Sequence, residues 1–160
     1  MNLRGAEPND IPFIMACERR PGYAPYVGNW TEEKHRAGMA NAAYRYLIGG
    51  DETAARGFAL LIDDTLRPEN LYLKRIAVYD ADKGHGRAIM AALNDWVFNN
   101  TDTHRFWLEV VDTNLRAIHL YKSLGFAVEG LVREAYVVDG VRGSFALMSI
   151  LRPEWLGRAR

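Results

Sequence analysis

The feature that most constrains the fold is a turn with two glycines at residues 83–88, Lys-Gly-His-Gly-Arg-Ala, between two segments of different periodicity. The run before it, Leu71 to Tyr79, is mostly apolar and is typical of a buried strand. After the turn, apolar residues recur at helical spacing at Ile89, Leu93 and Val97. The chain therefore contains a strand, a short turn and a helix in direct succession.

This turn is suited to binding a phosphate group. Gly84 and Gly86 let the backbone approach a ligand closely, and the free N–H groups and positive dipole end of a helix N-terminus favour an anion. Lys83 and Arg87 add positive charge. A tight turn without a ligand has the same glycine spacing. Ile89 replaces the third glycine of a dinucleotide site, and no Gly-Lys-Ser/Thr occurs, so dinucleotide and nucleoside-triphosphate sites are disfavoured.

A second segment, residues 114–126, reads Asn-Leu-Arg-Ala-Ile-His-Leu-Tyr-Lys-Ser-Leu-Gly-Phe. Together the two segments resemble the GNAT superfamily of acetyl-CoA-dependent N-acetyltransferases, whose motifs are Gln/Arg-x-x-Gly-x-Gly/Ala and Asn-x-x-Ala-x-x-Leu-Tyr-x-x-x-Gly-Phe. The second motif is matched at every specified position. The first departs at Ala81, where the family has Gln or Arg, so that pyrophosphate contact is missing or made by another residue. The C-terminal part looks like the ribosomal-protein and polyamine acetyltransferase branch.

The order of the periodic segments predicts one α/β domain over residues 1–160. With the resemblance, we expect a GNAT-like fold with a mixed, mostly antiparallel sheet flanked by helices. Asp10 suits a helix N-cap, Gly125 a left-handed C-terminal cap, and Asp139-Gly140 a hairpin turn. The expected strands are 3–7, 44–48, 57–62, 71–79, 105–111, 127–138 and 143–151, and the expected helices are 11–18, 31–41, one from the glycine turn to about 98, and 114–124.

Composition excludes several classes of function. Twenty Lys and Arg residues balance twenty Asp and Glu residues, so nucleic acid is not an expected partner. The one cysteine, Cys17, lies in an apolar stretch, and the histidines show no metal-ligand spacing, so we expect neither a disulfide nor a metal. There is no leader and no apolar run of membrane-spanning length, so no membrane association is expected and the cytoplasm is the default location.

The resemblance also implies catalytic residues. Tyr121 occupies the position of the usual general acid, which protonates the leaving thiolate; from helical spacing alone it would be a core tyrosine. Glu109 is the candidate base, because a charge within the apolar strand 105–111 is costly unless it is used or paired. Ribosomal-protein acetyltransferases carry Leu-Glu-Val at this strand with the same spacing to the tyrosine. Glu109 could instead point to solvent or pair with an arginine.

For the cosubstrate acetyl-CoA, the resemblance implies contacts that are mostly made by the main chain. The strand before the glycine turn would present its backbone to the thioester and pantetheine, the turn would hold the phosphates, and Asn114 would bond the pantetheine arm. Lys74 and Arg75 could assist, although alternating exposure explains them equally well. The expected cofactor-binding residues are Ile76, Ala77, Val78, Lys83, Gly84, His85, Gly86, Arg87, Ala88 and Asn114.

The acceptor is expected to be an amine: a protein N-terminus, a polyamine or another small amine. Aromatic residues Tyr23, Tyr26 and Trp30 with Glu32 and Glu33 could hold an ammonium, or could simply fix the loop and begin a helix. We interpret the chain as an N-acetyltransferase in which the amine attacks the thioester directly, without an acetylated cysteine. The alternatives are a non-catalytic acyl-CoA sensor and a transferase that uses another acyl-CoA.

A homodimer is possible as well. The apolar residues Phe145, Leu147 and Trp155 could contribute to a dimer interface, but packing in the core of one chain explains them without a partner.

Overall fold

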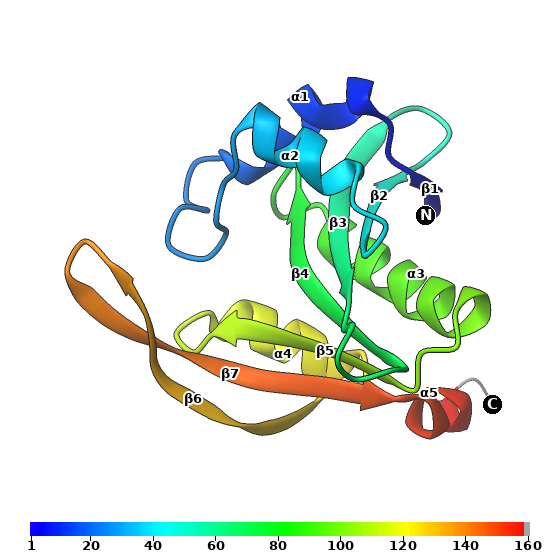
Figure 1. Ribbon diagram of the computed structural model, residues 1–160, viewed down its shortest axis with the longest axis vertical. Coiled ribbons are helices and arrows are strands. Elements are labelled where there is room, and N and C mark those ends of the chain that lie inside the picture. Colours follow the sequence, from blue (N-terminus) through cyan, green and yellow to red (C-terminus); the bar gives the residue numbers. More distant parts are fainter. Residues whose placement is uncertain (159–160) are drawn as a thin grey trace.

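The computed structural model describes residues 1–158, in which seven strands form one open sheet (Figure 1). The strands are β1 (Asn2–Gly5), β2 (Tyr44–Gly50), β3 (Ala55–Asp63), β4 (Asn70–Val78), β5 (Arg105–Val111), β6 (Ala127–Val138) and β7 (Val141–Leu151). Their order across the sheet is β1-β2-β3-β4-β5-β7-β6. Only β4 and β5 pair in parallel, and the other neighbours are antiparallel. The predicted α/β fold with a mixed, mostly antiparallel sheet is therefore confirmed.

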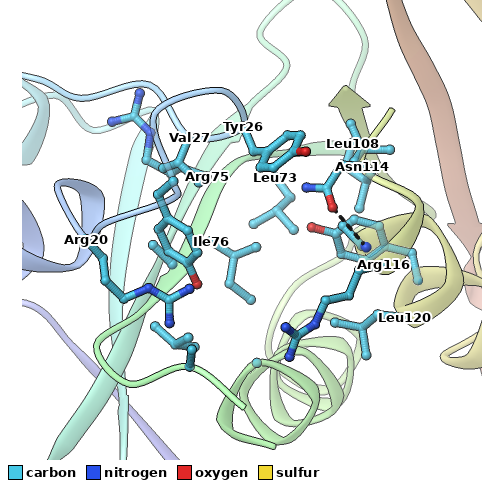
Figure 2. A pocket seen from close by; sticks show the side chains of 18 of the residues that line it. Arg20, Tyr26, Val27, Leu73, Arg75, Ile76, Leu108, Asn114, Arg116 and Leu120 are labelled. Atoms are coloured by element: carbon cyan, nitrogen blue, oxygen red, sulfur yellow. Dashed lines mark hydrogen bonds between the residues drawn. The ribbon is translucent and has the colours of Figure 1, made fainter. Parts of the chain in front are cut away.

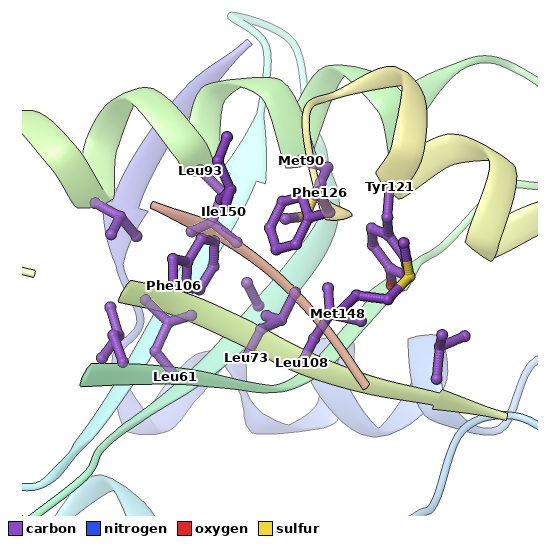
Figure 3. Close-up of a cluster of buried hydrophobic side chains, with 14 of the residues drawn as sticks. Leu61, Leu73, Met90, Leu93, Phe106, Leu108, Tyr121, Phe126, Met148 and Ile150 are labelled. Carbon is purple, nitrogen blue, oxygen red and sulfur yellow. The ribbon is translucent and has the colours of Figure 1, made fainter. Parts of the chain in front are cut away.

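Helices cover both faces of this sheet. They are α1 (Ile11–Glu18), α2 (Glu32–Met39), α3 (His85–Asn100), α4 (Leu115–Ser123) and α5 (Arg152–Arg158), with a 3₁₀ turn at Pro8–Asp10 before α1. One apolar cluster joins α1 to β2, β3 and β4, and a second joins α3, β4, β5, β7 and Phe126 (Figure 3). Within residues 1–158, no helix has the length and apolar character needed to cross a membrane.

The sheet divides at its single parallel pair. β4 and β5 pair from Asn70–Arg105 only as far as Leu73–Leu108, although both strands continue beyond this point. β5 stays paired with β7 over its whole length, so its free half follows the C-terminal hairpin. The C-terminal half of β4 stays paired with β3. The strands therefore separate after Leu73, within β4 and before the glycine turn that follows this strand.

A bulge in β4 lies next to this separation. Leu60 of β3 pairs with Arg75, whereas the next residue, Leu61, pairs with Leu73, so Lys74 is the extra residue on β4. Bulges bend a strand and redirect its side chains, and they are frequent near active sites. Here the bulge places two basic side chains, Lys74 and Arg75, next to each other at the point of separation.

Most predicted elements agree with the structure to within a few residues. The hairpin turn has Asp139 and Gly140 at φ of 50° and 77°, and Gly125 has φ of 105°, so both predictions from turn residues are confirmed. Asp10 stands at the N-cap position of α1 but does not cap it, because its carboxylate binds Arg4 and the Glu7 N–H. Helix α5 was not expected from the sequence.

Trp155 of α5 packs inside the chain. Its ring stacks on Phe98 with centroids 5.3 Å apart, and its indole N–H donates to Asp95 at 3.0 Å. In β7, Phe145 lies against Tyr136 at 4.7 Å. These contacts agree with the core-packing explanation for Trp155 and Phe145, and the dimer stays a prediction without further support.

A buried ionic network ties α1 and α2 to β4. Arg75 donates to one oxygen of Glu18, and the other oxygen accepts from the Trp30 N–H at 3.0 Å and lies 3.2 Å from His35 Nε2. His35 Nδ1 in turn lies 3.3 Å from the Tyr46 hydroxyl. Burial alone would raise the pKa of Glu18, but the contacts with His35, the Trp30 N–H and Arg75 hold it below its usual range. The network therefore favours a charged Glu18.

Replacing Glu18 by alanine is expected to lower the free energy of unfolding by about 3 kcal/mol at pH 7, because Arg75 and His35 lose their shared buried partner. A depressed pKa stabilises the fold above the unfolded-chain pKa of roughly 4.3, and this contribution disappears as pH falls through the folded-state value. The difference between wild type and Glu18→Ala in urea denaturation should therefore shrink in acid. Glu33→Ala, at an exposed position, is the control, and an equal loss in both variants would contradict the prediction.

Candidate active site

A cavity of about 950 Å³ opens where β4 and β5 separate (Figure 2). Its walls come from the loop between α1 and α2, the second half of β4, the glycine turn, the end of β5 and helix α4. Small-molecule sites usually have volumes of about 300–1,000 Å³, so this one is large enough for an extended ligand or for two ligands together. Figure 2 shows Arg20 on one wall and Arg116 and Leu120 of α4 on the opposite wall.

The glycine turn presents an open N-terminus of α3 to this cavity. Gly84 is the N-cap with φ of 76°, and its carbonyl accepts the N–H of Ala88 at 3.1 Å. The N–H groups of His85, Gly86 and Arg87 precede this first helical bond and so have no partner in the helix. A Cβ added at Gly86 would meet only Val78, at 3.9 Å. The backbone is accordingly accessible to an anion, and the binding of a phosphate here stays a prediction.

The predicted cofactor-binding residues fall into two groups. Ile76, Ala77, Val78, Gly84, His85, Gly86, Arg87 and Asn114 all line the cavity. Lys83 and Ala88 lie outside its lining: Lys83 forms an ion pair with Asp80 at 3.3 Å, and the Ala88 N–H is already used by Gly84. Arg87 borders the cavity, but its guanidinium donates to Ser123 on α4 at 2.6 Å. The structure therefore places Lys83 beside Asp80 rather than in the cavity lining, and its contact with a phosphate stays a prediction.

The main chain of residues 76–78 has one open side. Toward β3 it pairs with residues 57–59, whereas toward β5 the strand pairing has already ended at Leu73. The backbone groups on the open side therefore face the cavity. This part of β4 is thus able to offer its main chain to a ligand, and the contact itself stays a prediction.

Two side chains at the cavity have buried nitrogen atoms without a hydrogen-bond partner within residues 1–158. They are Nε and Nη1 of Arg20 and Nδ1 of His85. The Arg20 guanidinium also lies 3.8 Å from the centre of the Tyr23 ring. Buried unpaired N–H groups are costly, and their presence here is a reason to expect a ligand. Arg20 is not marked by any motif in the sequence; the one indication is that position 81 is Ala instead of the motif's Gln or Arg, so that a donor has to come from elsewhere.

Tyr121 extends from α4 toward the cavity. Its ring packs in the core beside Phe126, with centroids 5.8 Å apart (Figure 3), and the residue also lines the cavity. No hydrogen bond of its hydroxyl is found within the described part of the chain. Burial, with a smaller contribution from Tyr23, raises the pKa of Tyr121 well above its usual range. The residue thus belongs to both the core and the cavity wall, and its phenol stays protonated near neutral pH.

Glu109 lines the same cavity from β5. It accepts a hydrogen bond from the Tyr72 hydroxyl at 3.3 Å, and Tyr72 stacks on Trp107 with centroids 4.3 Å apart. Burial, together with the nearby Glu109 charge, raises the pKa of Tyr72. No arginine forms an ion pair with Glu109 among residues 1–158. The partially buried carboxylate is therefore available at the wall of the cavity.

Asn114 has a structural role in addition to its place in the cavity wall. Its side-chain oxygen accepts the Ala117 N–H at 3.2 Å and so caps α4 (Figure 2). The oxygen accepts from the helix, and the side-chain NH₂ group is the part of Asn114 that can donate a hydrogen bond to a ligand.

The expected acceptor residues are only partly brought together. Tyr23 and Tyr26 line the cavity, joined by Phe145 of β7. Trp30 lies outside the cavity lining and packs near His35, with centroids 5.5 Å apart. Glu32 pairs with Arg36 at 2.6 Å in the first turns of α2, which agrees with its alternative role at a helix start.

Comparison with known proteins identifies the family of this chain. Residues 8–126 match the model of the acetyltransferase (GNAT) family. Spermidine N(1)-acetyltransferase of Vibrio cholerae is 25% identical over 171 residues, covering 99% of this chain and 97% of that protein.

Two solved structures share the fold. The V. cholerae spermidine N-acetyltransferase in complex with CoA and spermine has a TM-score of 0.84 at 23% identity, with 97% of each chain covered. The Escherichia coli ribosomal-protein-S18-alanine N-acetyltransferase has a TM-score of 0.77 at 24% identity, with 94% of this chain and 92% of that chain covered. With the family model matched over most of its length, this chain belongs to the acetyltransferase (GNAT) family.

Proposed function

We propose that this acetyltransferase moves an acetyl group from acetyl-CoA to a primary amine by direct attack of the amine nitrogen on the thioester. The observation that carries the proposal is that Tyr121, Glu109 and the open N-terminus of α3 border one cavity at the separation of β4 and β5. Binding of a phosphorylated cosubstrate, proton removal and proton delivery can then take place within one space.

Acetyl-CoA supplies the activated acetyl group, and this chain's residues hold it. The N–H groups of residues 85–87 and the helix dipole would bind its pyrophosphate. The unpaired Arg20 guanidinium would supply the charged contact that Ala81 cannot make. The open main chain of residues 76–78 and the Asn114 amide would bond the pantetheine arm, and main-chain N–H groups would stabilise the oxyanion.

Glu109 acts on the amine. An alkylammonium with a pKa of roughly 10.4 must lose a proton before it can attack, which costs about 4–5 kcal/mol at pH 7. The Glu109 carboxylate, directly or through water, accepts that proton while the Tyr72 hydroxyl holds it in place. The nitrogen then forms its bond to the acetyl carbon, and the carbon–sulfur bond breaks.

Tyr121 acts on the leaving thiolate. A thiolate with a pKa of roughly 8.5 in water accepts a proton from a phenol only when the two are well positioned. Burial raises the pKa of Tyr121, so the phenol is protonated near neutral pH and has a proton to donate to the thiolate. Cys17 takes no part, because burial raises the pKa of its thiol to about 12.

The acceptor class follows less directly from family membership. The relatives described above are named for spermidine and for the alanine of ribosomal protein S18, so polyamines and protein N-termini are both included among the candidate acceptors. A sensor that binds acyl-CoA without turnover would not need an acid and a base at the same cavity. Use of another acyl-CoA stays an alternative.

The direct test measures release of free thiol from acetyl-CoA in the presence of primary amines. We expect thiol release that depends on both enzyme and amine, with one acetylated amine formed per thiol. Binding of acetyl-CoA without release for any amine would favour the sensor, and faster release from propionyl-CoA or a longer thioester would favour another acyl donor.

Replacing Tyr121 by phenylalanine is expected to lower kcat by about 100-fold, because general acid catalysis typically contributes 10²- to 10⁴-fold. The Kd for acetyl-CoA should stay nearly unchanged, since the ring and its packing are retained. Tyr79→Phe, at an exposed position outside the cavity, is the matched control. Unaltered turnover in Tyr121→Phe would remove this residue from the acid role.

Replacing Arg20 by alanine is expected to weaken acetyl-CoA binding by about tenfold or more, because a charge-assisted hydrogen bond to phosphate is lost. Isothermal titration with acetyl-CoA measures this change. Arg67→Ala, an exposed arginine outside the cavity, should bind like wild type. Wild-type affinity in Arg20→Ala would show that the unpaired guanidinium does not contact the cosubstrate.

A further inference from the structure

The acceptor end of the cavity carries an unusual charge pattern, which begins with the bulge in β4. Lys74 and Arg75 are consecutive, yet both approach aromatic residues on the same side of the sheet as α1 and α2. Lys74 Nζ lies 5.7 Å from the centre of the Tyr72 ring, and Arg75 lies 5.0 Å from that of Trp30. The register shift at this position is what removes the usual alternation.

The two cations differ in their partners. Arg75 is buried and bound to Glu18. Lys74 lines the cavity, is exposed, and has no carboxylate within ion-pair distance among residues 1–158. Desolvation lowers the pKa of Lys74, as do the nearby charges of Arg75 and Lys34, whereas Glu109 acts in the opposite sense. The pKa of Lys74 is therefore affected by two nearby cations and by one nearby carboxylate, that of Glu109.

Negative charge is scarce at this end of the cavity. The carboxylates in the lining are Glu109, Asp80 and Asp82, and the two aspartates belong to the turn that precedes α3. Asp80 is paired with Lys83, and Asp82 is paired with Arg116 at 2.6 Å. Among the described residues of the lining, Glu109 is the one carboxylate without a basic partner that can receive an ammonium near Lys74. A polyamine brings two or more ammonium groups, and an additional one would face the unpaired Lys74.

We propose that the preferred acceptor is a primary amine that also carries an anionic group, a carboxylate or a phosphate, which binds at Lys74 while the amine lies at Glu109. This rests on the proposed function and specifies its substrate class. A bound anion relieves the repulsion between Lys74 and its basic neighbours, while a second ammonium increases it. The same charges therefore select an anionic amine and reject a polycation.

The test uses acceptors in matched pairs that differ in one anionic group. Glycyl-glutamate and glycyl-glutamine represent a peptide acceptor, phosphoethanolamine and ethanolamine represent a small phosphorylated amine, and spermidine is the polycation. Acetylation of each is measured as kcat/KM at saturating acetyl-CoA. The wild type is expected to prefer the anionic member of at least one pair by about tenfold or more over its neutral partner and over spermidine. The pair that shows the larger ratio identifies the source of the anion.

Variants at Lys74 assign this preference to one side chain. Lys74→Ala should remove most of the preference, and Lys74→Glu should reverse it in favour of spermidine. Because Lys74 is exposed, both variants are expected to keep the thermal stability of the wild type. Lys122→Glu carries the same charge reversal on α4, outside the cavity, and should keep the wild-type ratios.

The outcomes separate this inference from the proposed function. Thiol release with none of the amines overturns the proposed function and the inference with it. Acetylation with spermidine equal to or better than both anionic acceptors, or ratios that Lys74→Ala and Lys74→Glu leave unchanged, overturns the inference alone and leaves the acetyltransferase activity in place.

Discussion

The parallel contact between β4 and β5 is the constraint on which the site depends. It extends only from Asn70–Arg105 to Leu73–Leu108, and each strand then follows its antiparallel neighbour, β3 or β7. A sheet interrupted in this way leaves main-chain groups of β4 without strand partners, which would be costly inside a sealed core. They are tolerated here because they face a cavity open to water or ligand. The defect in the sheet and the binding site are therefore the same feature.

A second constraint, the buried network around Glu18, holds one wall of this cavity in position. The loop between α1 and α2 forms one wall, and it has few regular contacts of its own. Glu18 connects this loop to the sheet. Its carboxylate accepts the N–H of Trp30, near the end of the loop, and also binds Arg75 at the bulge of β4. Buried ion pairs are weak evidence for stability but can specify one arrangement over others. In this chain the network ties the wall that carries Arg20 and Tyr23 to the strand that it faces.

The order of strands and helices and many residues of the cavity wall could be predicted from the sequence. Strand and helix periods predicted the elements, and Gly84, Gly125 and Asp139-Gly140 marked turns that adopt positive φ. It could not show that Lys83 would be drawn to Asp80 or that the Ala88 N–H would close the first turn of α3. Arg20 and the Glu18 network were missed because their partners lie 12 to 57 residues away or are absent. Such contacts depend on tertiary structure, and the periodicity of apolar residues does not predict them.

The two ends of the cavity differ in the kind of group that forms them. At the end bordered by α3, the helix N-terminus and the open edge of β4 are backbone features. They are therefore present whenever the fold is present. Around Glu109, the wall consists of side chains, Lys74 and Tyr72 among them, whose identity the fold does not determine. The fold shared with the two solved structures at 23–24% identity therefore does not determine the acceptor. The acceptor of this chain has to be inferred from its own charges, which is why the proposal for the acceptor rests on Lys74 and Glu109.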